Sequence, residues 1–159
     1  MTQTISALTK NSPGVLADMA QAIRKYNVNI RSISAGETED PTISRLTIGL
    51  DGSEDDIQRI TEEMADMDVI ISMDDLRRKE FVDRELVLVK VAMESACTTQ
   101  IMQIFEVFRA NVVGMGQRSI TVEMSGDRER VDGLIKMLAP FGIKSLCRSG
   151  MIALKRGDD

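Results

Sequence analysis

Hydrophobic positions alternate between two spacings along the chain. In the first half, short apolar or alternating stretches predict strands over residues 3–9, 29–37, 43–50 and 69–76. Between them, apolar residues recur three or four positions apart, which predicts two helices. The two apolar stripes consist of Val15, Leu16, Met19, Ile23 and Tyr26, and of Ile57, Ile60, Met64 and Met67. The predicted order is β-α-β-β-α-β.

The second half repeats this order. Residues 86–93 predict a strand, and residues 112–124 predict two strands around a glycine-containing hairpin. Residues 143–155 predict one last strand or two. The helical stripes are Ile101, Ile104, Phe105 and Phe108, and then Val131, Leu134, Ile135 and Leu138, with Pro140 and Gly142 ending the second helix.

The two halves also align with each other. Residues 46–60 match residues 120–134 at a fixed offset, with glycine at position 52 over glycine at position 126. The fold class is therefore α+β, with two tandem ferredoxin-like (βαββαβ) units. The predicted domains are 1–77 and 78–159, and the charged stretch 77–85 is the predicted linker.

Local signals mark several helix ends. Asn27 follows the first helical stripe and suits a left-handed terminator. Ser53 suits the N-cap of the second helix, whose first turn carries Glu54, Asp55 and Asp56. The methionines at 19, 64 and 137 lie on or beside apolar stripes, so we expect them to fill the core.

Composition argues against nucleic acid and membrane as partners. The 159 residues carry a net charge of −5, Lys and Arg are not clustered, and aromatics make up 3%. No apolar run is long enough to span a membrane. The N-terminus lacks the basic start and apolar core of a signal peptide, so we expect a cytoplasmic protein.

Few residues suit catalysis or metal binding. The chain has no His, and Cys97 and Cys147 share no metal-binding spacing, which indicates free thiols in a reducing compartment. We therefore expect no catalytic residues, no metal site and no cofactor in this chain. A small-molecule enzyme such as an acylphosphatase stays open as an alternative. It would need a phosphate-cradling loop with an Arg, and the first turn offers only Lys10.

The stretch NSPGVL at residues 11–16 lies between the first strand and the first helix. Pro13 suits a helix entry, and Gly14 lets a ligand approach the backbone. A ligand carboxylate there would gain the unpaired N–H groups of the first helical turn. Asn11 offers a donor and an acceptor for the charged head of an amino acid, and Val15 and Leu16 offer an apolar wall. On the residues alone, an ordinary capped turn stays open as well.

The strand predicted at 29–37 is expected at a sheet edge. It carries Ser32, Ser34, Ala35 and Gly36 and has no internal Lys or Pro to discourage pairing. We therefore expect two copies to pair there across a two-fold axis. Such a homodimer would bring residues 29 and 30 close to the other copy's NSPG turn.

Longer stretches resemble a known family. NSPGVLADMA, NVNIRSIS, TEDPTISRLTI, DRELVLVKV and GIKSLCRSGMIALKRG together resemble the small regulatory subunit of acetolactate synthase, also called acetohydroxyacid synthase. The resemblance covers essentially the whole chain. It implies that the first unit is an ACT domain and that a dimer binds valine between ACT domains. It also implies a partner, the catalytic subunit, which carries thiamine diphosphate, magnesium and FAD. The small subunit would raise the activity of this partner and make it sensitive to feedback inhibition.

The resemblance extends to the effector site. Asn11 and Gly14 fall on the turn that holds the charged head, Asn29 falls on the edge strand of the neighbouring chain, and Ile30 is expected at the aliphatic side chain. Family members often begin this strand with Gly-Tyr-Asn-Ile, whereas this chain reads NVNI and continues with Arg31 where an acidic residue is common. The choice among valine, leucine and isoleucine therefore stays open. The alternative function is a free-standing ACT-domain sensor that regulates another partner.

Overall fold

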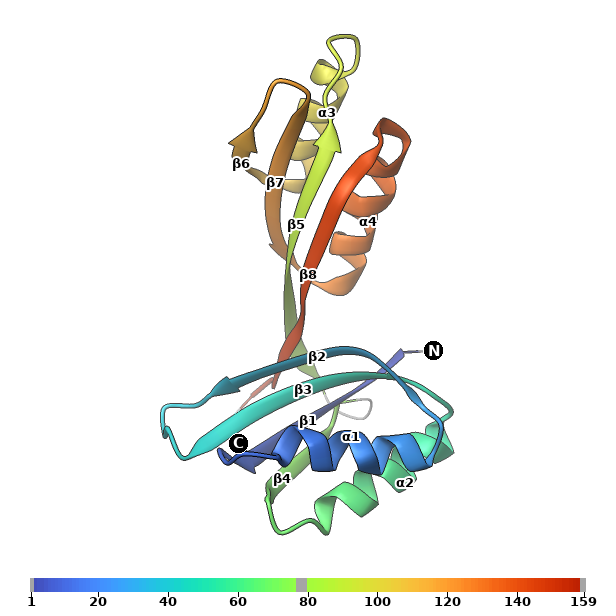
Figure 1. Ribbon diagram of the computed structural model, residues 1–159, viewed down its shortest axis with the longest axis vertical. Coiled ribbons are helices and arrows are strands. Elements are labelled where there is room, and N and C mark those ends of the chain that lie inside the picture. Colours follow the sequence, from blue (N-terminus) through green and yellow to red (C-terminus); the bar gives the residue numbers. More distant parts are fainter. Residues whose placement is uncertain (1, 77–79, 158–159) are drawn as a thin grey trace. The chain divides into compact units, whose positions relative to one another are not determined.

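The computed structural model describes residues 2–76 and 80–157 and divides the chain into two compact units. One unit comprises Met1–Val82 with Met151–Asp159, and the other comprises Asp83–Gly150. Figure 1 shows the elements of each unit in sequence colours. The domain limits 1–77 and 78–159 stay a prediction.

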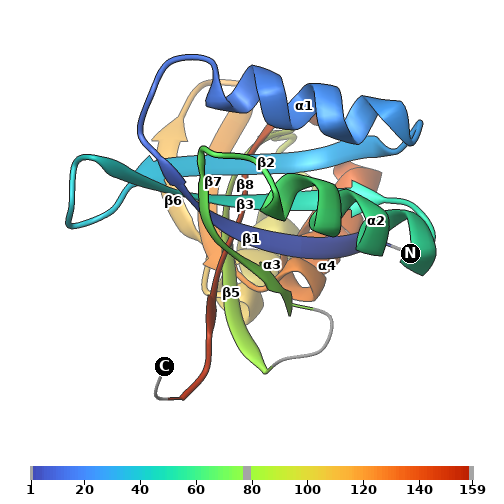
Figure 2. The same ribbon diagram turned by 90° about the horizontal axis from the view of Figure 1, so that it is seen from below.

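The first unit has the predicted βαββαβ order. Its elements are β1 (Thr2–Lys10), α1 (Val15–Lys25), β2 (Asn29–Glu37), β3 (Ile43–Asp51), α2 (Glu54–Ala65) and β4 (Ile70–Asp75). The four strands form one sheet in the order β2-β3-β1-β4, and all three pairings are antiparallel. The helices α1 and α2 lie together over one face of this sheet (Figure 2). The predicted edge position of β2 is therefore confirmed.

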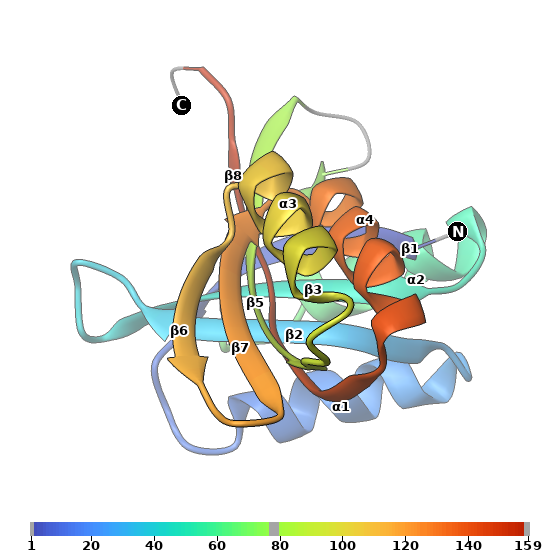
Figure 3. The ribbon, with the colours of Figure 1, turned by 90° about the horizontal axis from the view of Figure 1, so that it is seen from above.

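The second unit repeats this topology. Its elements are β5 (Phe81–Ala92), α3 (Thr98–Phe108), β6 (Asn111–Met115), β7 (Ser119–Gly126), α4 (Arg128–Leu138), the short helix η2 (Ala139–Phe141) and β8 (Ile143–Lys155). The strand order is β6-β7-β5-β8, the same pattern shifted by four strands. Figure 3 shows α3 and α4 over one face of the sheet. The predicted α+β class and the internal repeat are confirmed.

Each unit has its own hydrophobic core between the sheet and its two helices. In the first unit Ile5, Ile48 and Leu50 from the strands meet Ile23 and Ile57 from the helices, and all are at most 1% exposed. The second core is built in the same way from Val87, Val89, Val91, Ile101, Phe105, Ile120, Val122, Val131 and Leu134. These residues recur at every second position in the strands and at every third or fourth position in the helices. Burial of one face of each element explains both spacings.

The helix ends follow the predicted signals in most places. Asn27 has φ 54°, as a left-handed terminator requires. Ser53 is the N-cap of α2, and its Oγ accepts a hydrogen bond from the Asp56 backbone N–H at 3.2 Å. In the second unit the left-handed residue after α3 is Arg109, with φ 52°.

Replacing Ser53 with Ala is expected to destabilise the first unit by about 1 kcal/mol, because the start of α2 loses its capping oxygen. The measurement is urea unfolding followed by far-ultraviolet circular dichroism. Gln58→Ala is the matched control, since Gln58 is exposed on the same helix and its side chain donates to Glu62 one turn away. Equal unfolding midpoints for the two variants would contradict the capping role.

The predicted linker is wrong in its second part. β5 begins at Phe81, so residues 81–85 are strand, while residues 77–79 lie outside the described residues. The charged stretch folds as a strand because Glu85 is 6% exposed and pairs with Arg148 of β8. The charged stretch 77–85 therefore includes one member of a buried ion pair, which its composition did not indicate. Residues 143–155, which were predicted to form one strand or two, form one strand of 13 residues.

The methionine prediction is also partly wrong. Met19 and Met64 are at most 1% exposed and belong to the first core. Met137 is 50% exposed, because it lines an open groove beside α4. The two cysteines are free thiols as expected, with Cys97 half-buried and Cys147 exposed.

Candidate functional site

The turn between β1 and α1 is held by backbone bonds to two other segments. The Lys10 N–H donates to the Val69 carbonyl at 2.8 Å, and the Asn11 N–H donates to the Thr42 carbonyl at 2.7 Å. Gly14 ends the turn in the left-handed region, with φ 90°. An added Cβ at Gly14 would meet no atom within 4 Å, so the space next to this backbone is open.

The helix that follows begins without a side-chain cap. The N-cap is Gly14, which has no side chain to offer, and the first helical bond runs from the Asp18 N–H to the Gly14 carbonyl at 3.0 Å. The N–H groups of Val15, Leu16 and Ala17 precede that bond in the chain. They therefore present donors and the positive end of the helix dipole to the open space.

The amide of Asn11 is fixed in one orientation. Its Nδ2 donates to the Glu37 carboxylate at 3.0 Å and to the Pro41 carbonyl at 2.9 Å. Both N–H donors are thereby used, and no donor among the described residues bonds to Oδ1. Oδ1 is left as an acceptor for a ligand donor such as an ammonium group. Sequence reasoning missed Glu37 and Pro41 as partners, because they lie 26 and 30 positions away.

Asp40 organises the β2–β3 turn that supplies Pro41. Its Oδ1 accepts from the Thr42 hydroxyl at 2.7 Å and from the Thr42 N–H at 2.8 Å. These hydrogen bonds, the hydroxyl bond first, lower the pKa of the Asp40 carboxyl below its ordinary value. Because the pKa is lowered, the ionised Asp40 carboxylate stabilises the turn fully at pH values above the ordinary Asp pKa of about 3.9. This stabilisation is lost as the pH falls through the lower, folded-state pKa.

Thr42→Val is expected to raise the pKa of Asp40 towards its ordinary value, because the stronger of the two donors is removed while the side-chain shape is kept. The measurement is an NMR titration of the Asp40 carboxyl. Thr38→Val is the control: the Thr38 hydroxyl bonds only to the backbone of Asp40. If Thr38→Val moved the titration as far as Thr42→Val, the hydroxyl bond would not be the cause.

The two apolar residues of the turn differ in exposure. Val15 is 5% exposed and belongs to the core, so it can offer a ligand its backbone N–H but little of its side chain. Leu16 is 50% exposed and stays available as an apolar wall. Pro13 is exposed in the turn itself.

The structure does not bring the remaining predicted residues to this turn within one chain. Lys10 pairs with Ile43 at one end of the sheet, whereas Asn29 pairs with Asp51 at the other. Eight strand positions separate these ends, or roughly 25 Å at ~3.3 Å per residue. Asn29 and Ile30 therefore lie far from Asn11 of their own chain.

The two residues that depart from the family pattern, Val28 and Arg31, make contacts within the first unit. Val28 packs against the first core, and a Cβ added to Gly52 would come within 2.9 Å of its side chain. Arg31 forms an ion pair with Asp51 at 3.5 Å on the exposed face. Val28 thus fills space inside the unit.

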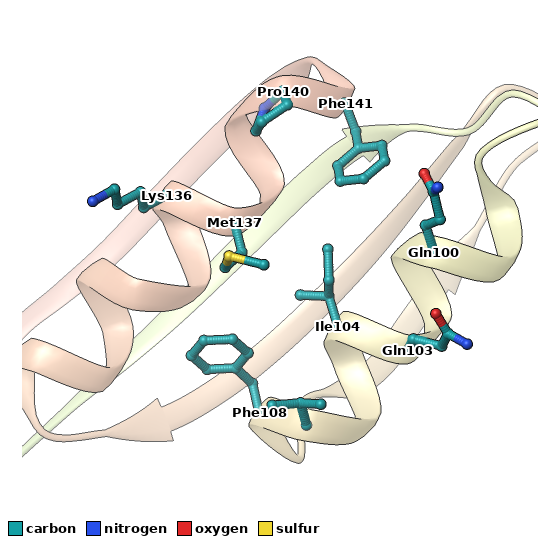
Figure 4. A pocket seen from close by; sticks show the side chains of 9 residues that line it. Gln100, Gln103, Ile104, Phe108, Lys136, Met137, Pro140 and Phe141 are labelled. Atoms are coloured by element: carbon teal, nitrogen blue, oxygen red, sulfur yellow. The ribbon is translucent and has the colours of Figure 1, made fainter.

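The second unit has a groove of about 490 Å³ between α3 and α4 (Figure 4). Ile104, Phe108, Met137 and Phe141 form its apolar lining, with Gln100, Gln103 and Lys136 also contributing. None of the predicted site residues lines this groove. The turn before α3 has Cys97 as N-cap and lacks a left-handed glycine, so it does not reproduce the β1–α1 turn.

Among residues 2–76 and 80–157, no group of three or more Cys, Asp or Glu side chains is arranged to hold a metal ion. Each helix in these two ranges is too short or too polar to span a lipid bilayer.

Comparison with known proteins gives consistent matches over both units. Residues 5–72 match the family model "AHAS small subunit-like ACT domain", and residues 84–157 match "Small subunit of acetolactate synthase". The acetolactate synthase small subunit of Mycobacterium bovis is 35% identical over 156 residues, covering 98% of this chain and 93% of that protein. The Aquifex aeolicus small subunit is 34% identical, covering 96% and 80%.

A solved structure supports the same assignment. The acetolactate synthase small subunit of Thermotoga maritima aligns with a TM-score of 0.85 and 28% identity, over 100% of this chain and 99% of that one. The ACT domain and the ferredoxin-like repeat are thereby established together with the sequence match. The chain belongs to the family of acetolactate synthase small subunits, the regulatory, non-catalytic subunits of that enzyme.

Proposed function

We propose that this regulatory subunit binds valine at a site shared by two copies and transmits the bound state to the catalytic subunit as feedback inhibition. The main support is the β1–α1 turn, where a left-handed Gly14, an uncapped helix start and an oriented Asn11 surround open space. This combination suits a ligand that has both a carboxylate and an ammonium group.

The proposed position of valine follows from the donors and acceptors of the turn. The carboxylate accepts from the first N–H groups of α1, where the helix dipole favours negative charge. The ammonium donates to Oδ1 of Asn11, the acceptor that the Glu37 and Pro41 bonds leave available. The aliphatic side chain lies against Leu16, which is half-exposed.

The proposed dimer completes the site. β2 is an edge strand, and antiparallel pairing of two β2 strands centred near Ile33 sets position 29 of one copy opposite position 37 of the other. Glu37 already bonds to Asn11. Asn29 and Ile30 of the second copy therefore come to the turn that they cannot reach within their own chain.

The proposed dimer also suggests a preference among the branched-chain amino acids. Ile30 of the second copy and Leu16, which is 50% exposed, would form an aliphatic wall against the side chain of valine. The side chains of leucine and isoleucine are one methylene longer, and we expect these amino acids to be weaker effectors. Such a difference is worth about 1–3 kcal/mol in an apolar pocket.

The catalytic chemistry is proposed to lie in the partner. In this proposal the catalytic subunit holds thiamine diphosphate, magnesium and FAD and condenses two 2-oxo acids, and this chain raises its rate. Effector binding then favours the less active of two arrangements of the complex. By linkage, catalytic-subunit binding must alter valine affinity by the same factor.

Reconstitution tests the proposal. Adding the purified chain to the purified catalytic subunit is expected to raise acetolactate formation, and valine is expected to reverse that increase. A chain that neither activates nor confers valine sensitivity would contradict the proposal. The alternative, a free-standing sensor for another partner, would give valine binding without any effect on acetolactate formation. Matches to small subunits over both units favour the first outcome.

A further inference from the structure

The carboxylate of Glu37 lies beside the amide group to which the proposed ammonium group donates. Glu37 is the last residue of β2, and its register partner is Ser44 of β3. Lys10, the last residue of β1, pairs with Ile43 at the same end of the sheet. Figure 1 shows the β1–α1 turn and the β2–β3 turn together at this end. The hydrogen bond of 3.0 Å from Asn11 Nδ2 to Glu37 Oε1 joins the two turns.

Backbone bonds of the β2–β3 turn hold the end of β2 in place. The Thr38 N–H donates to the Ile43 carbonyl at 2.9 Å, and the Ile43 N–H donates to the Asp40 carbonyl at 2.9 Å. The Asp40 carboxylate is bonded to Thr42 of the same turn. These bonds fix the position from which the Glu37 side chain extends.

Two acceptor atoms are left available around the bond between Asn11 and Glu37. Within residues 2–76 and 80–157, no donor bonds to Oδ1 of Asn11 or to Oε2 of Glu37, and no Lys or Arg forms an ion pair with Glu37. The Glu37 side chain is exposed, so a ligand reaches it from solvent. An ammonium group has three donors and a positive charge, which matches two acceptors of which one is charged.

We propose that Glu37 makes the effector site selective for amino acids over 2-oxo acids of the same carbon skeleton. The ligand ammonium donates to Oδ1 of Asn11 and to Oε2 of Glu37, while the ligand carboxylate accepts from the start of α1. This inference rests on the proposed valine site and adds the charged group that recognises the ammonium end of the ligand.

A 2-oxo acid would bring the wrong charge and the wrong hydrogen-bonding group to this site. It has the carboxylate of the amino acid, but a keto oxygen replaces the ammonium group. That oxygen is an acceptor, so Asn11 Oδ1 and the Glu37 carboxylate would be left without a donor. The single negative charge of the 2-oxo acid is also repelled by Glu37, whereas a zwitterionic amino acid has no net charge. In the proposed function the catalytic subunit consumes 2-oxo acids, so the effector site has to reject them.

Calorimetric titration of the full-length chain with valine, and with the 2-oxo acid that has the carbon skeleton of valine, tests this selectivity. The unaltered chain is expected to bind valine at least ~100-fold more tightly, because the 2-oxo acid leaves polar groups of the site unpaired. Glu37→Gln keeps an acceptor for the Asn11 amide and removes the charge. This variant is expected to bind valine about tenfold more weakly, and its selectivity is expected to fall by at least the same factor.

Glu39→Gln is the matched control, because Glu39 is exposed in the same turn and its replacement removes the same charge. This variant is expected to keep the selectivity of the unaltered chain. Circular dichroism melting verifies that both variants fold. Unchanged selectivity in a folded Glu37→Gln chain would overturn the inference. An equal loss in Glu39→Gln would also overturn it, because the net charge of the turn would then be the cause.

The unaltered chain separates this inference from the proposed function. If it bound valine and the 2-oxo acid equally well, the effector site would stand, but Glu37 would not select the ammonium group. If neither the unaltered chain nor its complex with the catalytic subunit bound valine, the proposed function would be refuted, and the role of Glu37 would be refuted with it.

Discussion

Replacing Gly14 with Asp is expected to give a complex that is active and resistant to valine. The new carboxylate would occupy the open space beside the α1 N-terminus, where the proposed ligand carboxylate accepts its hydrogen bonds. Two charge-assisted bonds are worth about 1.5–3 kcal/mol each, so valine affinity is expected to fall at least ~100-fold. The left-handed backbone costs Asp about 1–2 kcal/mol, and no atom within 4 Å obstructs its Cβ. The variant should therefore fold and activate.

Gly14→Asn is the matched control for charge. Asn has nearly the same shape and accepts the left-handed region, but its amide does not replace a carboxylate at the helix start. Its loss of valine affinity is expected to be smaller than that of Gly14→Asp. The measurement is the valine dependence of acetolactate formation by each reconstituted complex. Inhibition of the Gly14→Asp complex at the usual valine concentration would contradict the site assignment.

Replacing Ile33 with Lys is expected to dissociate the dimer and abolish valine binding together with it. Ile33 is 43% exposed at the middle of β2, so in the proposed pairing it faces its own copy across the two-fold axis. The change removes apolar burial of roughly 1 kcal/mol per copy and adds roughly 1 kcal/mol of repulsion between opposed charges. Dimer affinity is then expected to fall ~100-fold. Sedimentation at micromolar concentration measures it.

Ile71→Lys is the matched control. Ile71 is 49% exposed on β4, the opposite edge strand of the same sheet, so its replacement adds the same charge to the same unit. This variant is expected to remain dimeric and to bind valine. If both variants or neither became monomeric, β2 would not be the dimer interface. If Ile33→Lys became monomeric and still bound valine, the site would not be shared between copies.

Local sequence signals were enough to predict the fold. The spacing of Ile5, Ile48 and Leu50 in strands and of Ile23 and Ile57 in helices follows from burial on one face of each element. Because two such patterns occur in the same order, the repeat and both sheets could be expected. The β2 edge followed from the topology alone, before any side chain was considered.

Long-range polar contacts could not be predicted in this way. Glu85 is charged and lies in a charged run, so it suggested a linker, but its partner Arg148 is 63 positions away. The hydrogen bonds from Asn11 to Glu37 and Pro41 could not be predicted either, because these partners lie 26 and 30 positions away. The spacing of apolar residues indicates which face of a helix or strand is buried, but it does not indicate which polar groups of different elements bond to each other.

Backbone conformation was predictable only where the turn chemistry is distinctive. Gly14 follows Pro13 at the start of a helical stripe, where a glycine permits unusual φ values, and its φ is 90°. Gly150 lies inside an apolar strand pattern, where a glycine gives no sign of whether its φ is positive. Its left-handed conformation is therefore known only from the structure.

Calorimetric titration of the purified chain with valine is the most direct test of an effector site shared by two copies. We expect saturable binding that Asn29→His removes, because Asn29 of the second copy completes the turn formed by Asn11 and Gly14. Absence of binding both to the chain alone and to the complex with the catalytic subunit would contradict the proposed effector site. Binding that Asn29→His leaves unchanged would equally contradict a site shared between two copies.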